Sequence, residues 1–291
     1  MYPAMSSPLD ALPAPDATGG VEALTSLLRG RRTVVLTGAG CSTESGIPDY
    51  RGPGTRARAR NPIQHREFLT RPEVRARYWA RSLLGWPRFS SARPNAAHHA
   101  LAALERDGHV QGLITQNVDR LHHAAGSSRV IELHGALARV RCLGCGELEA
   151  RVELQERLVA LNPDFSHEVL ELRPDGDAEL SSELLASFQV PACLRCGGTL
   201  KPDVVFFGDN VPPPTVQEAF ALLEAGDALL VVGSSLAIFS GYRFLMRASE
   251  RRMPIAILNI GECRGVELAD VLVEARAGDV LPGLAQALAR G

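Results

Sequence analysis

The chain has 291 residues with 31 basic and 33 acidic side chains, so its formal net charge is −2. This balance argues against a general nucleic-acid binder, because such a protein needs excess basic charge to neutralise phosphates. The 45% apolar content is that of an ordinary globular protein. No apolar run approaches the ~20 residues that cross a bilayer, so we expect no membrane partner.

The first 20 residues are rich in Pro, Ala and Ser, and we expect them to form a disordered lead-in. They lack the basic start and the continuous apolar run of a secretory signal. Four of the six cysteines form two C-x-x-C pairs, which favours metal ligation over disulfides. We therefore expect a cytoplasmic protein, and the single lysine, Lys201, among many arginines indicates a GC-rich bacterial source.

Helical and strand patterns alternate from Val21 onward. A helix is predicted over 21–28 and a buried strand over 33–37, followed by helices over about 67–84 and 95–107. Further buried strands are predicted at 113–115, 130–133, 204–207, 228–232, 255–259 and 271–274. Strands separated by helix-length segments are typical of βαβ units, so the sequence predicts an α/β fold with a parallel sheet.

Residues 141–199 interrupt this alternation and are predicted to form a small inserted module, which leaves 21–140 and 200–291 for the α/β domain. The module holds two C-x-x-C pairs, made by Cys142, Cys145, Cys193 and Cys196. Each pair precedes a glycine that permits a positive φ, and two such knuckles supply four thiolates to tetrahedral zinc. A site closed by four protein ligands is structural; unligated redox dithiols are the alternative.

A glycine-rich segment, Gly38-Ala39-Gly40, follows the first predicted strand directly. Such a turn lets backbone amides and a helix N-terminus bind a pyrophosphate, although Thr43 stands where a third glycine is expected, and a plain tight turn is the alternative. Two more turns of small residues follow predicted strands, at 233–235 and 259–261. Three turns at carboxyl ends of parallel strands favour a dinucleotide-binding crevice.

Polar side chains also follow a strand in mid-chain, at Gln116, Asn117 and Asp119. Asn117 and Asp119 offer a donor and an acceptor that suit a carboxamide, with a helix cap as the alternative. His134 precedes Gly135 at the expected carboxyl edge of a sheet, where ligands bind. The histidines at 98, 99, 122 and 123 lie in helical patterns, where packing or surface roles suit them better.

Several motifs follow one another in a fixed order along the chain: GAG-x-S-x-x-SGIPDYR, TQN-x-D, ELHG, the two C-x-x-C pairs, KPDVVFFGD, VGSSL and NIG. Taken together, these motifs resemble those of the sirtuins, NAD-dependent protein lysine deacylases. The resemblance covers about 21–288, and segments such as STESGIPDYRG and SGYRF are similar to the class II branch that includes the sirtuin-4 type. It implies a Rossmann-like sheet with helices on both faces plus a zinc module, with NAD and an acyl-lysine peptide entering the cleft between them.

The resemblance also implies roles for individual residues. The residues that would contact NAD are Gly38, Ala39, Gly40, Ser42, Asp49, Tyr50, Arg51, Gln116, Asn117, Val118, Asp119, Gly233, Ser234, Ser235, Asn259, Ile260, Gly261 and Ala277. Asn117 and Asp119 would line the nicotinamide pocket and take part in catalysis. His134 would be the general base, taking a proton from a ribose hydroxyl after the acyl oxygen attacks C1′. Imidazole suits this step because its pKa of ~6.5 lies near working pH.

The substrate side is implied in the same way. The acylated protein lysine would add as a strand along Val204, Val205, Phe206, Phe207 and Gly208. Tyr78 and Arg81 have the spacing with which sirtuin-5-type enzymes recognise acidic acyl chains; a solvated Arg81 is the alternative. The alternative functions are protein mono-ADP-ribosyl transfer and a non-catalytic module that binds ADP-ribose or acyl-lysine. The sequence predicts neither the oligomeric state nor the preferred acyl chain.

Overall fold

The computed structural model describes residues 17–49, 63–163, 165, 185 and 187–290. Tyr50 and Arg51 lie outside these ranges. The larger part is a six-stranded parallel sheet in the order β3-β2-β1-β7-β8-β9. Its strands are β1 (Thr33–Thr37), β2 (Val110–Thr115), β3 (Val130–Glu132), β7 (Ala228–Val232), β8 (Ile255–Leu258) and β9 (Val271–Val273).

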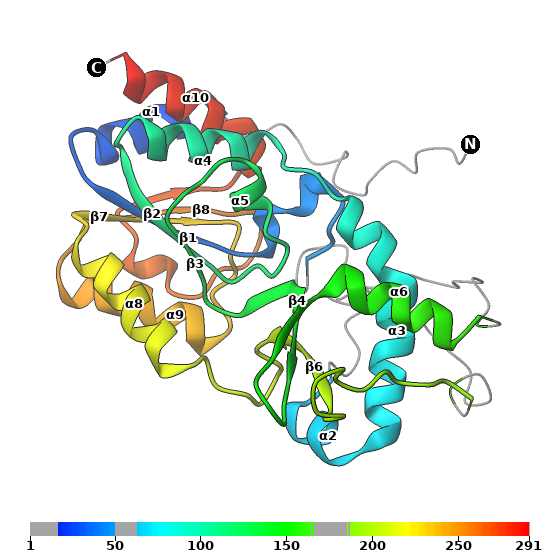
Figure 1. The fold of residues 1–291 in the computed structure, drawn as a ribbon. Coiled ribbons are helices and arrows are strands. Elements are labelled where there is room, and N and C mark those ends of the chain that lie inside the picture. The colour runs from blue at the N-terminus through cyan, green and yellow to red at the C-terminus, as the bar shows by residue number, and fades with distance from the viewer. Residues whose placement is uncertain (1–16, 50–62, 164, 166–184, 186, 291) are drawn as a thin grey trace, which may run out of the picture.

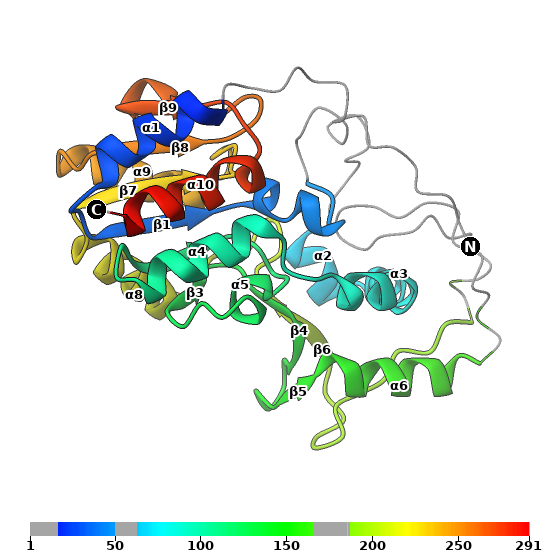
Figure 2. The ribbon, with the colours of Figure 1, turned by 90° about the horizontal axis from the view of Figure 1, so that it is seen from above.

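Helices cover both faces of this sheet, as expected (Figures 1 and 2). Along β1, Val35 packs toward α1 (Ala17–Leu28), α4 (Ala96–Arg106) and α10 (Ala277–Ala289), while Val34 and Leu36 pack toward α8 (Pro213–Glu224) and α9 (Phe239–Glu250). Side chains of a strand alternate between its faces, so each apolar strand contributes to two cores. The short elements are η2 (Ala39–Cys41), η3 (Thr43–Ser45), α5 (Leu121–Ala124) and η4 (Val266–Leu268).

A small domain lies beside the carboxyl ends of the central strands (Figure 1). Its antiparallel sheet has the order β5-β4-β6, from β4 (Gly135–Cys142), β5 (Leu148–Ala150) and β6 (Leu200–Val204). The helices around it are α2 (His65–Thr70), α3 (Pro72–Ser91) and α6 (Arg151–Leu161). Phe68 and Trp79 share one apolar cluster with Leu154 and Cys142, so this core draws on α2 and α3 as well as on residues 141–199.

The structure differs from the predicted elements in three places. The predicted strand at 204–207 is wrong as a member of the parallel sheet, because β6 ends at Val204 and pairs with β4 in the small sheet. The predicted helix at 67–84 is broken at Arg71, whose extended backbone precedes Pro72. Helix α1 begins at Ala17, inside the expected lead-in.

Within the described ranges, no helix is both long enough and apolar enough to cross a bilayer.

Candidate active site

The loops after β1, β7 and β8 open into one cavity of about 720 Å³. The strand order reverses between β1 and β7, and doubly wound sheets bind their ligands at this point. Segment 204–211 and the helix α3 also contribute to the wall, so the cavity lies between the parallel sheet and the small domain.

Three glycines allow the loops after β1 and β7 to touch. The Gly40 N–H donates to the Gly233 carbonyl oxygen at 2.8 Å, and a Cβ at Gly40 would lie 2.9 Å from the Gly233 Cα. Gly233 has a φ of +58°, and a Cβ there would lie 2.3 Å from the Cys41 nitrogen. A Cβ at Gly38 would meet Ser234 at 2.8 Å. Side chains at these positions are excluded, so the two loops lie in direct contact and give the cavity a wall of small residues.

Most of the predicted NAD contacts line this cavity. They are Gly38, Ala39, Gly40, Ser42, Asp49, Gln116, Asn117, Val118, Asp119, Gly233, Ser234, Ser235, Asn259, Ile260 and Ala277. Gly261 does not, and its carbonyl oxygen instead accepts a hydrogen bond from Asn259 Nδ2 at 3.2 Å. The three turns that the sequence placed at strand ends therefore converge on a single cavity.

A chain of hydrogen bonds joins Asn117 to Asp119. Asn117 Nδ2 donates to the Gly38 carbonyl oxygen at 3.0 Å and to Ser42 Oγ at 3.1 Å. Ser42 Oγ donates in turn to Asp119 Oδ2 at 2.7 Å, while Asp119 Oδ1 accepts the N–H of Leu121, the first residue of α5, at 2.9 Å. Burial raises the pKa of Asp119, although these hydrogen bonds oppose the rise. The carboxylate therefore holds the start of α5 and also lines the cavity.

His134 is fixed at both ring nitrogens. Its Nδ1 lies 3.0 Å from the Gln116 carbonyl oxygen, which can only accept, so Nδ1 carries the proton. Nε2 therefore has a lone pair, and it accepts a hydrogen bond from Ser240 Oγ at 2.8 Å. Burial lowers the pKa of His134, and Arg243 lowers it further, while the Gln116 hydrogen bond opposes the shift. The ring is thus a neutral base near pH 7, and both His134 and Ser240 line the cavity.

The predicted substrate residues also meet at this cavity. Tyr78, Arg81, Val204, Val205, Phe206, Phe207 and Gly208 all line it. The Val205 N–H donates to the His134 carbonyl oxygen at 2.9 Å, and the Phe207 carbonyl oxygen accepts from the His65 N–H at 2.9 Å. The Tyr78 ring packs edge-on against Phe206, with centroids 5.4 Å apart. The segment after β6 is therefore held beside the candidate base.

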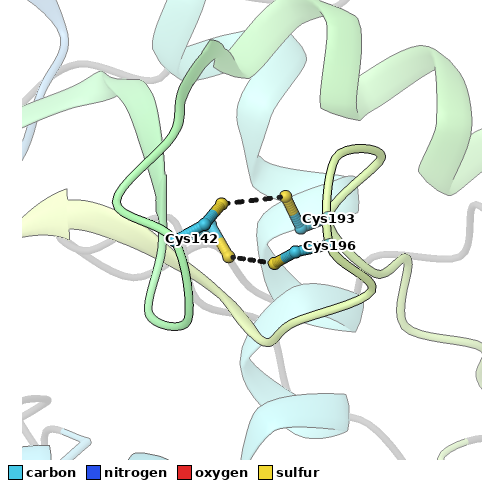
Figure 3. Close-up of side chains that lie close together, drawn as sticks. Cys142, Cys193 and Cys196 are labelled. Atoms are coloured by element: carbon cyan, nitrogen blue, oxygen red, sulfur yellow. Dashed lines mark hydrogen bonds between the residues drawn. The ribbon is translucent and has the colours of Figure 1, made fainter.

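The four predicted metal ligands converge, with all four Sγ atoms within 4.8 Å of one another. Two knuckle loops face each other, and their sulfurs pair (Figure 3): Cys142 Sγ lies 3.5 Å from Cys196 Sγ, and Cys145 Sγ lies 3.8 Å from Cys193 Sγ. Zn–S bonds of about 2.3 Å in a tetrahedron place sulfurs roughly 3.8 Å apart, so the geometry fits zinc. The Gly144 N–H donates to Cys142 Sγ at 3.3 Å, a contact that favours the thiolate form of this ligand.

Sequence reasoning missed Ser240 and Arg243, which line the cavity from the first turns of α9. It also missed that Cys41, His98 and His122 form a second buried cluster, with one potential ligand atom from each within 4.8 Å. His98 and His122 have the packing role that was expected of helical histidines, since both are buried. No spacing in the sequence indicates that these side chains meet, because they come from three separate elements.

Comparison with known proteins agrees with this geometry. Residues 38–240 match the model of the Sir2 family. Sirtuin-4 of Bos taurus, named a mitochondrial NAD-dependent protein lipoamidase, is 55% identical over 255 residues, covering 87% of this chain and 81% of the relative. An NAD-dependent protein deacetylase of Xanthomonas campestris is 52% identical over 258 residues, covering 89% of this chain and 88% of the relative.

Solved structures give the same result. A structure described as Sir2 with p53 peptide and NAD+ superposes with a TM-score of 0.73 at 29% identity, covering 93% of this chain and 99% of that one. A family model that spans the glycine-rich loop, the candidate base and the zinc knuckles, together with relatives above 50% identity, establishes the family. The chain belongs to the Sir2 family, the sirtuins.

Proposed function

We propose that this chain is an NAD-dependent protein lysine deacylase that converts an acylated lysine and NAD into free lysine, nicotinamide and O-acyl-ADP-ribose. The observation that carries the proposal is the position of His134. His134 lines the same cavity as the glycine-rich loops and the Asn117–Asp119 network, and its neutral ring carries the Nε2 lone pair that a base needs. Relatives at 50–55% identity are named NAD-dependent protein deacylase, deacetylase or lipoamidase.

Each group in the cavity suits one part of this reaction. The touching loops at Gly40 and Gly233 form a wall of small residues at the carboxyl ends of β1 and β7, where a pyrophosphate can approach closely. Asn117 and Asp119 suit the nicotinamide carboxamide, which needs one donor and one acceptor. His134 Nε2 would take the proton of a ribose hydroxyl, so that this oxygen can attack the acyl carbon, whose own oxygen is by then bonded to C1′. The ring can accept this proton because Nδ1–H already donates to Gln116.

The experiment follows nicotinamide release. The protein is incubated with NAD and either an acylated peptide or the same peptide with a free lysine. We expect nicotinamide only with the acylated peptide, and one free lysine for each nicotinamide. Equal release with both peptides, or transfer of labelled ADP-ribose to a protein without acyl groups, would support ADP-ribosyl transfer instead.

For the acyl chain, we propose that Arg81 pairs with a substrate carboxylate, as the Tyr78–Arg81 spacing suggests. The support is that both residues line the cavity that His134 lines. A second guanidinium, that of Arg243, lines the same wall and adds positive potential.

A peptide panel tests this assignment with acetyl, succinyl, hydroxymethylglutaryl, lipoyl and long-chain acyl groups. We expect a higher kcat/KM for the acidic chains than for the others. Arg81→Ala should lower kcat/KM for the acidic chains by about tenfold or more, because a charge-assisted hydrogen bond is lost. Arg88→Ala is the matched control, since Arg88 lies exposed near the end of the same helix. No preference for acids, or an equal preference in Arg81→Ala, contradicts the proposal.

The cytoplasmic location also stays a prediction.

A further inference from the structure

The hydroxyl of Ser240 is hydrogen-bonded to the Nε2 lone pair of His134, which the general base needs to accept a proton. Its Oγ lies 2.8 Å from His134 Nε2, and it must donate, because the ring proton is on Nδ1. Ser240 is buried in the first turn of α9 and lines the cavity. A ribose hydroxyl that gives its proton to Nε2 must therefore take the place of this serine hydroxyl.

We propose that Ser240 is a positioning residue for the general base, and that its hydroxyl holds the Nε2 lone pair of His134 until a ribose hydroxyl displaces it. This inference rests on the proposed deacylase function. With Gln116 bound to Nδ1 and Ser240 bound to Nε2, the ring cannot rotate without breaking a hydrogen bond. The base is thus kept in a single orientation and tautomer before the substrates arrive.

The placement of Ser240 is itself rigid, because α9 packs directly on the residues around the base. A Cβ at Gly241 would lie 2.6 Å from Gln116 Oε1, so no side chain separates the helix from this glutamine. Gln116 Nε2 also donates to Ser234 Oγ at 2.7 Å, which ties it to the loop after β7. The serine, the base and the glutamine therefore form one unit that joins α9, the turn between β3 and β4, and the loop after β2.

The hydrogen bond from Ser240 also affects the pKa of His134. A hydrogen bond donated to Nε2 stabilises the neutral imidazole, so it lowers the pKa of His134. Arg243, from the same helix, is the charged group that also lowers this pKa, whereas Gln116 and Ser240 are uncharged. Two carboxyl groups, those of Asp49 and Asp119, line the same cavity. Removing the serine hydroxyl should therefore raise the pKa of His134.

The test compares Ser240→Ala with Ser240→Thr, which keeps a hydroxyl, and with Ser249→Ala at the far end of α9. The first readout is the His134 titration, followed by NMR in protein without substrates. We expect Ser240→Ala to raise this pKa by up to about one unit and the other two variants to leave it unchanged. An unchanged pKa in Ser240→Ala overturns the proposal, and this readout does not depend on any deacylase activity.

The second readout is the pH profile of kcat/KM with an acylated peptide. In Ser240→Ala the acid limb should move to higher pH, so that the loss of activity is up to about tenfold at low pH and nearly absent above pH 8.5. A merely structural role would lower kcat/KM equally at every pH and leave the limb in place, which would overturn the proposal. Lack of turnover in the wild type would instead contradict the proposed function, while the NMR titration would still decide the role of Ser240.

Discussion

Two buried histidines behind the cavity show how a single residue's surroundings set its chemistry. Thr37 Oγ1 donates its only hydrogen to Thr115 Oγ1 at 2.8 Å. It must therefore accept from His122 Nε2, which lies 2.9 Å away and carries the ring proton. Burial lowers the pKa of His98 to about 4 and the pKa of His122 to about 3. Both rings are therefore neutral in the folded protein, although histidine in an unfolded chain has a pKa of about 6.5.

This difference predicts a loss of stability in mild acid. Because the folded-state pKa values are depressed, the contribution of these histidines is fully present above pH ~6.5 and is lost as the pH falls toward 4. Each buried histidine should remove up to about 1.4 kcal/mol of unfolding free energy per pH unit in this window. Denaturant unfolding between pH 5 and 7 measures the slope.

The matched variants are His122→Gln and, on the exposed side of α4, His99→Gln. His122→Gln should give a smaller fall in unfolding free energy over this window than the wild type, while His99→Gln should keep the wild-type slope. Parallel pH curves for all three proteins would contradict neutral burial of His122.

At the scale of elements, contact between the loops after β1 and β7 shapes the cavity. Gly40→Ala would place a Cβ 2.9 Å from the Gly233 backbone, which cannot move aside as a flexible side chain can. We expect a loss of about 1–3 kcal/mol in unfolding free energy, as for other overpacked sites. We also expect the loss of the thermal stabilisation that NAD gives to the wild type, because the loops must separate.

Gly30→Ala is the control for this prediction. Gly30 also resists a side chain, with a φ of +70°, but a Cβ there meets nothing within 4 Å. It should cost about 1–2 kcal/mol through backbone strain alone and leave stabilisation by NAD intact. If Gly40→Ala bound NAD as Gly30→Ala does, the close loop contact would not matter for the cofactor.

The sequence predicts the strands of the parallel sheet well, because runs such as those of β1 and β7 are apolar on both faces and end at turns of small residues. It fails at 204–207, since an equally apolar segment gives no sign of which sheet it joins. It predicts His134 and the zinc ligands through their motifs. It assigned no role to Ser240, although the SGYRF segment begins there, because this serine lies 106 positions from its partner and the segment gives no sign of contact with His134.

For the whole molecule, zinc and α3 together hold the small domain. Cys142 and Cys193 belong to the same apolar cluster as Trp79. Both tryptophans of the chain, Trp79 and Trp86, lie in α3, so tryptophan emission reports on this domain alone. A small core of this kind depends on its metal, because ligand binding and folding are coupled.

We therefore expect about one zinc per chain. Loss of this zinc, through the substitution Cys196→Ser or through chelation, should shift tryptophan emission to longer wavelength. The far-UV circular dichroism of the larger parallel sheet should change little, since its two apolar cores do not include the cysteine knuckles. Cys263→Ser is the control, because Cys263 lies outside the knuckles and should keep its zinc. Unchanged emission after zinc removal would contradict this role.

The most direct measurement of the central claim is mass spectrometry of the products from NAD and an acylated peptide, with the wild type and His134→Ala. We expect equal amounts of free-lysine peptide and O-acyl-ADP-ribose from the wild type. We expect the rate of product formation to fall by at least about 100-fold in His134→Ala, since general base catalysis contributes this much. O-acyl-ADP-ribose formed by His134→Ala at the wild-type rate would contradict the role of His134, and deacylated peptide without this product would contradict the proposed reaction.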